Sequence, residues 1–542
     1  MEGSDEIKSG KQKYLYWAAL AMIIACAAVI RGRMTSMPLE RDEGEYAYIA
    51  QELLRGVLPY ESAYSMKLPG IYAVYAAIIS VFGQTATAIH TGLIIVNAAT
   101  IVFVFLLARE IFGGLAAAVA SGAYAIMSML SSVLGMSANA EHFVVLPALA
   151  GIWLLVKFRE RNNLIVTFVS AILLGTAFII KQHGVFFGVF GALYLLCHDI
   201  LRRPIQLKKA VMNQVVFASG AIMPFALVCF IFWKAGLFGK FWFWAFTYAS
   251  KYTARIPLSA VGEIFIAHFS PVVESAKWIW IFVPLGLAIV IVIKQYRRWV
   301  LFLFGFLIFS FFAVCPGFYF RHHYFIFLLP AAAILAGGGL VLAIERILQG
   351  FRTPGRTAII GITALAIGVY CLYQQRTILF RNNPEVVCRM IYGFNPFPES
   401  LPIADFIRAN TDANDKVAVI GSEPQIYFYS GRRAATTYIY TYPLVEPHDF
   451  AGKMQEEMIK QIEEAKPKIL VFVRVYFSWL HGPKSIDHIF KWFDAYQSQY
   501  YEVVGYADMV SGAYTVWKWN EEAVNYKPTS ENWVAIFRRK AE

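Results

Sequence analysis

Residues 14–31, YLYWAALAMIIACAAVIR, form an apolar run, and the sequence Arg41-Asp42-Glu43-Gly44-Glu45-Tyr46 follows shortly after it. An apolar run of this length predicts a helix that spans a membrane. The motif Lys67-Leu68-Pro69-Gly70 comes next along the chain. Ionisable groups near a membrane are energetically costly and usually mark function. Carboxylates followed by a lysine therefore favour an enzyme at a membrane surface over a passive pore.

The composition is that of a membrane protein. The chain has 542 residues, of which 58% are hydrophobic and 15% are charged, with a mean hydropathy of +0.53. About a quarter of the residues are charged in a typical soluble domain. The net charge of +12 is explained by basic loops that face anionic lipid, so no nucleic-acid partner is expected. The six cysteines are scattered and show neither a disulfide framework nor metal-ligand spacing.

Including residues 14–31, about eleven runs are apolar enough to predict membrane spans. They lie at 14–31, 88–108, 115–136, 142–157, 164–181, 183–198, 212–233, 277–293, 299–317, 323–345 and 357–375. Every second connection is rich in cations, as at Lys157, Arg159 and Arg161 or at Arg202 and Arg203. Because such loops face the cytoplasm, the pattern predicts a cytoplasmic N-terminus and an exported C-terminus.

Two outer segments are expected to lie at the membrane interface. The run 68–83 is apolar and nearly long enough to cross, but a crossing there would turn every cation-rich loop outward. We therefore expect an interfacial helix in the first outer loop. Residues 235–276 form a longer outer loop whose beginning is dense in aromatic residues. These aromatics suit either an anchoring belt or a wall for a lipid chain or sugar ring.

The composition changes after the last span, which divides the chain into three parts. Residues 1–375 are the predicted transmembrane domain, 376–398 a proline-punctuated linker, and 399–542 an exported soluble α/β domain. Within the last part, helices are expected at 399–410 and 448–466 and buried strands at 416–420 and 468–473, with edge strands at 501–506 and 513–519. Alternating helices and strands predict a sheet with a parallel core.

The topology predicts that the unexpected polar residues gather on one side of the membrane. They are Asp42, Glu43, Glu45, Lys67, Glu141, Lys181, His183, Arg321, His322 and His323. If 42–55 is helical, Asp42, Glu45 and Tyr46 share a face. These acids either stabilise the helix through its dipole or take part in the reaction, one as a general base and the other as an orienting group. Convergence of the whole set favours the chemical interpretation.

The basic residues can also be interpreted as purely structural. Lys67 is either an interfacial lysine or a group that neutralises a leaving phosphate. Arg321-His322-His323 is either an anchor or a second phosphate clamp, and a zinc site from two adjacent histidines is the weaker idea because no further ligands are evident. Glu141 also suits a helix start, and Lys181-Gln182-His183 also suits a solvated turn.

The chain resembles the glycosyltransferase-C superfamily. The resemblance rests on RDEGEYAYIAQELLRGVLPYESAYSMKLPG (41–70), LAREIFGG (107–114), SANAEHFVVLPALAG (137–151), GTAFIIKQHG (175–184), YFRHHYFIFLLPAAAILAGG (319–338) and KVAVIGSEPQIYFYSGRRAATTYIY (416–440). The branch it is similar to is the bacterial one of protein O-mannosyltransferases and lipid A aminoarabinose transferases. The chain has Leu68-Pro69 where the family has Pro-Pro, and Glu45 where some members carry Arg.

The resemblance implies a hexosyl or pentosyl transferase of the bacterial inner membrane that takes its sugar from a polyprenyl phosphate and serves an extracytoplasmic glycan, lipid or protein acceptor. It implies a catalytic role for Asp42 with Glu43, and a donor-phosphate role for Lys67. By extension we expect Lys181, Arg321, His322 and His323 at the phosphate, and Glu45, Tyr46, Glu141 and His183 at the sugar or acceptor.

The expected reaction is a single inverting displacement by an acceptor hydroxyl, with no obligatory metal, although a divalent metal stays open. Three rivals remain at this point. A flippase for lipid-linked glycans would also have many spans and buried charges, but no inverted repeat is seen. An oligosaccharide polymerase or ligase would share the donor chemistry. A sensor with an exported α/β domain would not depend on Asp42 or Lys67.

Overall fold

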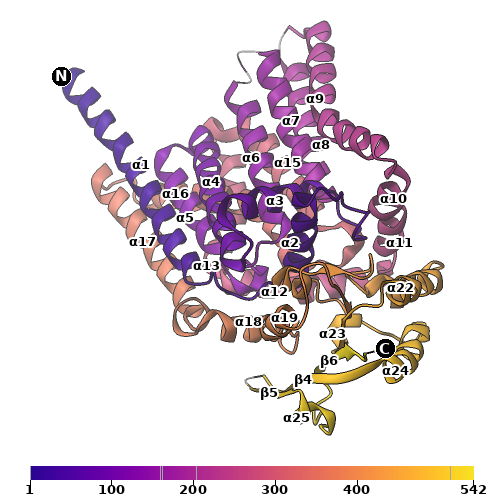
Figure 1. Cartoon of the computed structure of the whole chain (residues 1–542). Helices are drawn as coiled ribbons and strands as arrows, with labels where there is room; N and C mark the ends of the chain where they lie inside the picture. The colour runs from indigo at the N-terminus through magenta and orange to yellow at the C-terminus, as the bar shows by residue number, and fades with distance from the viewer. Residues whose placement is uncertain (1, 159, 161–162, 203, 513, 542) are drawn as a thin grey trace.

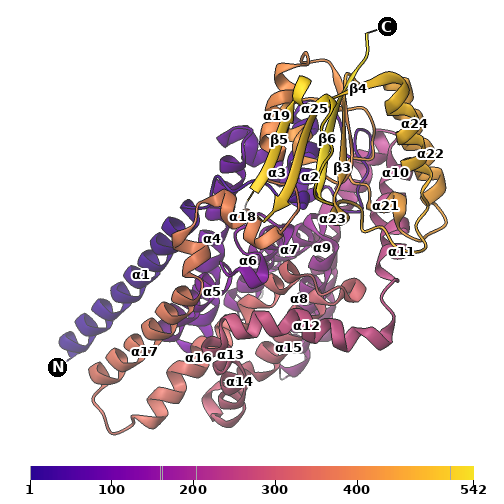
Figure 2. The ribbon, with the colours of Figure 1, turned by 90° about the horizontal axis from the view of Figure 1, so that it is seen from below.

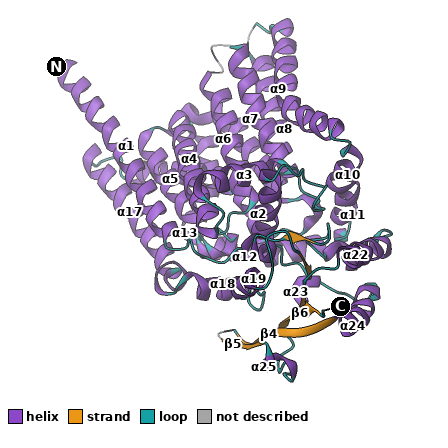
Figure 3. Cartoon of the chain, in the orientation of Figure 1, coloured by secondary structure: helices purple, strands orange, loops and turns teal. Residues whose placement is uncertain are grey.

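The computed structural model describes residues 2–158, 160, 163–202, 204–512 and 514–541, with the backbone alone for residues 2–13. The loop cations Arg159, Arg161 and Arg203 named above lie outside the described residues. Figure 1 shows a bundle of long helices with a smaller domain at one end, and Figure 3 shows that the described strands all belong to this smaller domain. The predicted polytopic helical fold with a C-terminal α/β domain is confirmed.

Eight helices among the described residues are long and apolar enough to cross a membrane, if the short turns before α8 and α15 are included. They are α1 (Glu2–Gly32), α4 (Ala86–Phe112), α6 (Ala140–Phe158), α8 (Val185–Leu201), α9 (Leu207–Lys234), α15 (Val300–Val314), α16 (Leu329–Ile347) and α17 (Thr353–Gln374). The remaining three predicted spans are helices as well, but they are shorter: α5 (Gly114–Met127), α7 (Leu164–Ile180) and the pair α13 (Lys277–Trp280) and α14 (Phe282–Val292).

The span predicted at 115–136 ends early, because α5 stops at Met127. The chain then forms an irregular turn whose carbonyl groups are used by a buried cation. Arg31 donates hydrogen bonds of 2.6 Å to the carbonyl oxygens of both Ser128 and Gly135. In a continuous helix those carbonyl groups would accept backbone hydrogen bonds instead, and the guanidinium would lack acceptors.

The segment 235–276, predicted as a longer outer loop, is mostly helical. It contains α10 (Phe238–Trp242), the π-helical turn η4 (Phe243–Tyr248), α11 (Ala249–Thr253), the turn η5 (Leu258–Ala260) and α12 (Val261–Ser275). The two halves are bent by 68° and together would be apolar enough to span. The sequence A-R-I-P at 254–257 explains the break, because proline lacks an N–H group and disfavours helix in the residue before it.

The first outer loop contains two helices, α2 (Arg41–Leu54) and α3 (Gly70–Phe82), close to the predicted ranges 42–55 and 68–83. Glu40 and Glu43 form a reciprocal capping box that starts α2 at Arg41. The two helices pack against each other, and α2 also packs against the C-terminal domain. This packing leaves Glu43, Tyr46 and Ile49 fully buried, although the loop is strongly polar in sequence.

The C-terminal domain follows the short helix α18 (Pro384–Tyr392), which lies in the predicted linker. Its helices are α19 (Ser400–Ala409), α20 (Gln425–Ser430), α21 (Tyr442–Val445), α22 (Ala451–Ala465), α23 (Tyr476–Trp479), α24 (His488–Tyr500) and α25 (Glu521–Val524). Its strands are β1 (Lys416–Ile420), β2 (Arg433–Ala434), β3 (Ile469–Arg474), β4 (Tyr501–Ser511), β5 (Tyr514–Trp519) and β6 (Trp533–Arg539).

The six strands form one mixed sheet in the order β2-β1-β3-β6-β4-β5. The predicted parallel core exists as β2, β1 and β3, but β6, β4 and β5 join antiparallel. The prediction of two late edge strands is half wrong: β5 is an edge, whereas β4 is interior. The reason is β6, which the sequence interpretation missed and which inserts between β3 and β4.

One face of the sheet closes against the helix bundle. Val417 and Val471 belong to a hydrophobic core that continues into the bundle through α20 and α2. In Figure 2, seen from the side of the C-terminal domain, the sheet is in front of α2, which contacts this domain through α20. The opposite face packs under α22 and α24 in a second core. The α/β domain is therefore anchored on the first outer loop, where the predicted chemical residues lie.

Candidate active site

A cavity of about 520 Å³ lies where α2, the turn after α7, α11, the turn before α16 and the C-terminal domain meet. One part of its wall is apolar and includes Phe178, Val185, Trp244 and Phe246. The other part is polar, and it includes Glu40, Arg41, Asp42, Glu45, Lys67, Lys181, His183, Arg321, His323, Asn395, Tyr440 and Tyr442. The cavity thus offers both charged and apolar side chains to one ligand.

Helix α2 presents its acids to this cavity. Asp42 and Glu45 are one turn apart, so their side chains share a face. The other side of the helix is held tightly against α20, because a Cβ atom on Gly44 would lie 2.6 Å from the backbone nitrogen of Gln425. Glycine at this position allows the close approach that turns the acidic face toward the cavity.

Lys67 bridges the two acids. Its Nζ donates hydrogen bonds of 2.9 Å to Asp42 Oδ1 and 3.1 Å to Glu45 Oε2. The ammonium also lies 4.8 Å from the centre of the Tyr46 ring. The predicted meeting of the acidic motif and the lysine is therefore present in the fold, in a largely buried setting where charges interact strongly.

A second cluster of charge faces the first across the cavity. Lys181 forms a salt bridge with Glu141 and lies 4.4 Å from the centre of the Tyr324 ring. His323 Nε2 lies 3.8 Å from Glu141 Oε1. The guanidinium of Arg321 lies 5.3 Å from the centre of the Tyr319 ring, and its side chain lines the cavity. Three basic groups thus come from two turns that are far apart in sequence.

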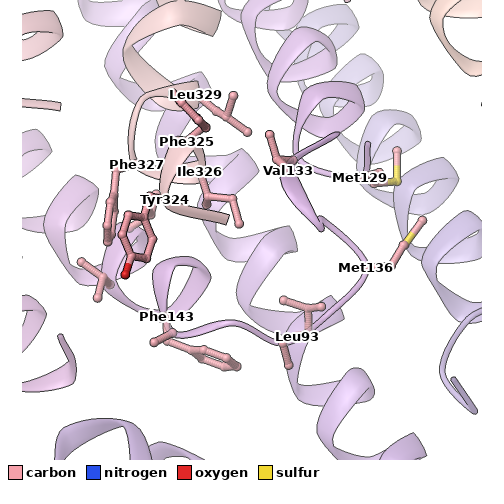
Figure 4. Packing of buried hydrophobic residues seen from close by; sticks show 14 of the residues in the cluster. Leu93, Met129, Val133, Met136, Phe143, Tyr324, Phe325, Ile326, Phe327 and Leu329 are labelled. Atoms are coloured by element: carbon pink, nitrogen blue, oxygen red, sulfur yellow. The ribbon is translucent and has the colours of Figure 1, made fainter. Parts of the chain in front are cut away.

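The turn that carries Arg321 and His323 is fixed by its own apolar residues. Figure 4 shows Tyr324, Phe325, Ile326 and Phe327 packed beside Phe143 of α6 and Val133 of the turn after α5. Phe325, Ile326 and Phe327 are fully buried. Their burial anchors this 3-10 turn, so that Arg321 and His323 are held at the cavity wall.

Charge and burial compete at the two central residues. Burial opposes ionisation of Asp42, but the positive charges of Lys67 and, more weakly, Lys181 favour the carboxylate, and the pKa of Asp42 lies below its usual range. Burial likewise disfavours the Lys67 ammonium, but Asp42 and Glu45 outweigh it and raise the pKa of Lys67 well above its usual range. Asp42 and Lys67 are therefore both charged at neutral pH.

The neighbouring groups are shifted differently. Burial lowers the pKa of His323 to about 4, against the charge of Glu141, so this imidazole is neutral at neutral pH. Burial, followed by the charges of Asp42 and Glu43, raises the pKa of Glu40 well above its usual range. The shift favours the neutral acid form of Glu40 beside the Asp42 carboxylate, an effect that its place before the acidic motif did not suggest.

Four of the predicted site residues do not line the cavity. Glu43 points the other way and accepts hydrogen bonds from His90 at 2.9 Å and from the Ala138 amide at 2.5 Å. Tyr46 lies beneath Lys67, and Glu141 lies behind Lys181. His322 faces a different cavity, where its ring centre is 4.9 Å from that of His268.

The sequence interpretation named no residue of the C-terminal domain among the site residues. Arg41, inside the acidic motif, donates hydrogen bonds to Ser422 O at 2.6 Å, Asn395 Oδ1 at 3.0 Å and Glu423 Oε1 at 3.0 Å. Tyr440 and Tyr442 line the cavity. The aromatic string T-T-Y-I-Y-T-Y at 436–442 was the available signal.

Among the residues that the structure describes, no group of three His, Cys, Asp or Glu side chains is placed to hold a metal ion. The basic side chains of Lys67, Lys181 and Arg321 are the groups at hand for an anion in this cavity. The expectation that no metal is obligatory stays a prediction, to be tested by experiment.

Comparison with known proteins supports this interpretation of the fold. Residues 67–233 match the family model of the dolichyl-phosphate-mannose-protein mannosyltransferases. Among curated protein sequences no significant match is found. The chain also shares its fold with solved structures of distant sequence.

Two solved structures illustrate this likeness. The first is ArnT from Cupriavidus metallidurans bound to undecaprenyl phosphate, with 14% identity and a TM-score of 0.56 over 95% of this chain and 97% of that one. The second is the archaeal oligosaccharyltransferase AglB from Archaeoglobus fulgidus, in complex with an inhibitory peptide and a dolichol-phosphate. It has 13% identity and a TM-score of 0.51 over 96% of this chain and 75% of that one.

Proposed function

We propose that the protein is a membrane glycosyltransferase that moves a hexosyl or pentosyl group from a polyprenyl phosphate to an acceptor hydroxyl. The observation that carries the proposal is the Asp42–Lys67–Glu45 cluster, which lines a cavity whose wall also has apolar residues. The fold it shares with ArnT and AglB supports the same conclusion, since the structures of both contain a polyprenyl-type phosphate.

The donor would lie across the cavity with its isoprenoid chain on the apolar wall and its phosphate among the cations. Phe178, Val185 and Trp244 offer surface to the chain, and Val185 is 42% exposed. Lys67, Lys181 and Arg321 stand around the phosphate. Cations fixed in a poorly hydrated site stabilise the charge that appears on a leaving phosphate during transfer.

The acceptor hydroxyl attacks the anomeric carbon from the side of Asp42. The new bond joins that hydroxyl oxygen to the anomeric carbon, the bond from the anomeric carbon to the phosphate oxygen breaks, and the hydroxyl proton passes to the Asp42 carboxylate. One displacement of this kind inverts the anomeric configuration. When the phosphate shares the charge of Lys67, the pKa of Asp42 rises toward its usual range, which makes the carboxylate a better base.

The roles of the remaining residues follow from their places. Glu45 and His183 line the cavity and are assigned to the sugar or acceptor. Glu43 lies outside the cavity and is assigned to holding α2 in place through His90. The cavity lies at the end of the bundle that carries the C-terminal domain, so we assign both to the extracytoplasmic side of a bacterial inner membrane, with a cytoplasmic N-terminus.

The test is sugar transfer by the purified full-length protein in lipid nanodiscs, with a panel of undecaprenyl-phosphate-linked hexoses and pentoses as donors. Asp42→Asn should lower transfer by about 10²–10⁴-fold, the range for loss of a general base. The matched control is Asp449→Asn, because Asp449 is 85% exposed. Donor binding should survive in Asp42→Asn. Wild-type transfer rates in that variant would refute the proposal.

A further inference from the structure

A second cavity, of about 760 Å³, lies in the C-terminal domain and shares no lining residue with the first. It is a groove between α24, the segment after β3, and the strands β3, β6 and β4. Aromatic rings form its floor and walls, and charged side chains stand at its rim. Nothing in the proposed transfer chemistry requires these residues.

The pairing of the strands explains why the rings gather on one face. Phe472 of β3 pairs with Ala535 of β6, and Ala535 in turn pairs with Tyr506 of β4. A bulge between Val503 and Gly505 shifts the register, so that Tyr506 shares the face of Val503. Without this extra residue the alternation of side chains would have turned Tyr506 to the opposite face.

The rings form a continuous surface. The ring centre of Trp533 lies 5.9 Å from that of Phe472 and 5.9 Å from that of Tyr506. Farther along the groove, the ring centre of Phe490 lies 4.6 Å from that of Trp479. The rings of Phe472, Tyr506, Phe490 and Trp533 are only partly buried, so apolar surface is left for a ligand.

Unused polar groups surround this surface. Arg474, Asp494 and Glu531 are exposed and line the groove. The guanidinium of Arg474 lies 5.6 Å from the centre of the Trp533 ring. Within the described part of the chain, none of these three side chains makes a hydrogen bond or ion pair. A ligand that combines a flat apolar face with many hydroxyl groups matches this arrangement, and sugar rings have that character.

A peptide ligand fits less well. Peptides that add to a sheet need a strand edge with free backbone groups. The strands under the groove, β3, β6 and β4, are interior strands whose backbone groups are paired on both sides. The groove therefore offers ring faces and side-chain groups, and these suit a glycan.

The groove also adjoins the catalytic cavity. Tyr442, in the cavity wall, donates a hydrogen bond of 2.5 Å to the carbonyl oxygen of Phe477. Tyr476 and Trp479, in the same short segment, line the groove. We propose that the groove binds an oligosaccharide part of the acceptor at a distance from the reacting hydroxyl. The statement that the bound oligosaccharide is part of the acceptor rests on the proposed transferase function. The prediction that the groove binds an oligosaccharide does not.

Saturation-transfer NMR on the full-length protein in nanodiscs tests the proposal, with maltoheptaose, chitohexaose, a linear mannohexaose and an oligogalacturonide as probes. At probe concentrations of about 10 mM, a complex with a Kd of about 1 mM is readily seen. We expect signals from the ring C–H protons of at least one probe. Tyr506→Ala and Trp533→Ala should each weaken binding by about tenfold, as expected for loss of an aromatic face.

Further variants distinguish loss of binding from loss of folding. Glu531→Gln and Asp494→Asn change exposed groups without threatening the fold, and they should also weaken binding. Tyr514→Ala is the matched control, because Tyr514 is 63% exposed on β5 outside the groove. Asp42→Asn should bind as wild type, so this proposal and the proposed function fail independently.

Three results would overturn the inference. The first is the absence of signals from every probe. The second is binding that is unchanged in all four groove variants. The third is saturation transfer to an unglycosylated Ser/Thr-rich peptide with none to the oligosaccharides, which would assign the groove to a polypeptide.

Discussion

Replacing Lys67 with Met should change both the rate of transfer and its dependence on pH. In the wild type, Lys67 Nζ lies 2.9 Å from Asp42 Oδ1, and the two side chains are only 12% and 17% exposed. At an effective dielectric constant of about 20, unit charges at this separation attract by about 6 kcal/mol. Burial is the largest single influence on Asp42, but this attraction and the smaller ones beside it together outweigh burial, so the pKa of Asp42 is lowered.

The sign of the pH effect follows from this balance. The wild-type Asp42 carboxylate stays ionised between about pH 5 and pH 8, so transfer should show no loss from Asp42 protonation there. In Lys67→Met the nearest cation is gone and burial raises the pKa of Asp42. Asp42 then takes up a proton as the pH falls, and residual transfer should decline from pH 8 toward pH 5.

The size of the rate effect is that of a lost charge-stabilising donor, about 10²–10³-fold in kcat. Transfer of labelled sugar by protein in nanodiscs, followed across this pH range, measures both effects. Lys251→Met is the matched control, because Lys251 is 51% exposed and lies 3.7 Å from Asp449 instead of from Asp42. A pH profile for Lys67→Met that coincides with that of the wild type would refute the electrostatic reasoning.

Three other expectations can be checked on the same preparation. Glu43→Gln should lower the free energy of unfolding by about 3 kcal/mol, because it weakens a buried pair with His90. An unchanged free energy of unfolding would contradict the assignment of Glu43 to holding α2 in place. Gly44→Ala should destabilise the contact with Gln425 by about 1–3 kcal/mol, since its Cβ atom would overlap the neighbouring backbone; thermal unfolding at wild-type temperature would disprove this tight packing. Treatment with EDTA should leave transfer intact if cationic side chains alone hold the phosphate, and loss of activity that returns with Mg²⁺ or Mn²⁺ would show that they do not.

Local patterns predicted the helical part of the fold well. Apolar runs such as 212–233 and 357–375 report burial in lipid directly, and each became a long helix. The run at 115–136 was misjudged because its second half serves Arg31, a contact between residues about a hundred positions apart. The missed strand β6 has a similar cause, since its place in the sheet depends on pairing with distant strands.

The site was predictable where helix geometry decides it. The spacing of Asp42 and Glu45 places both on one face of α2, and Lys67 meets them there. Local spacing could not show that Glu43 turns away, because its hydrogen-bonding groups come from His90 and from the Ala138 amide.

The basic turn before α16 shows the same limit in its two neighbouring histidines. His323 faces the cavity, whereas His322 faces His268. Which imidazole points inward is decided by the packing of the turn that follows them and not by their own identity.

The hydrogen bonds of Arg41 have a consequence for biosynthesis. This residue emerges from the ribosome early, yet Glu423, which accepts one of its hydrogen bonds, comes 382 residues later. At translation rates of roughly 5–20 residues per second, the delay is about 20 to 80 s. During that interval α2 lacks its contacts with the C-terminal domain. The protein should therefore become able to catalyse the proposed transfer only near the end of its synthesis. A chain that terminates before Glu423 would insert into the bilayer and remain inert.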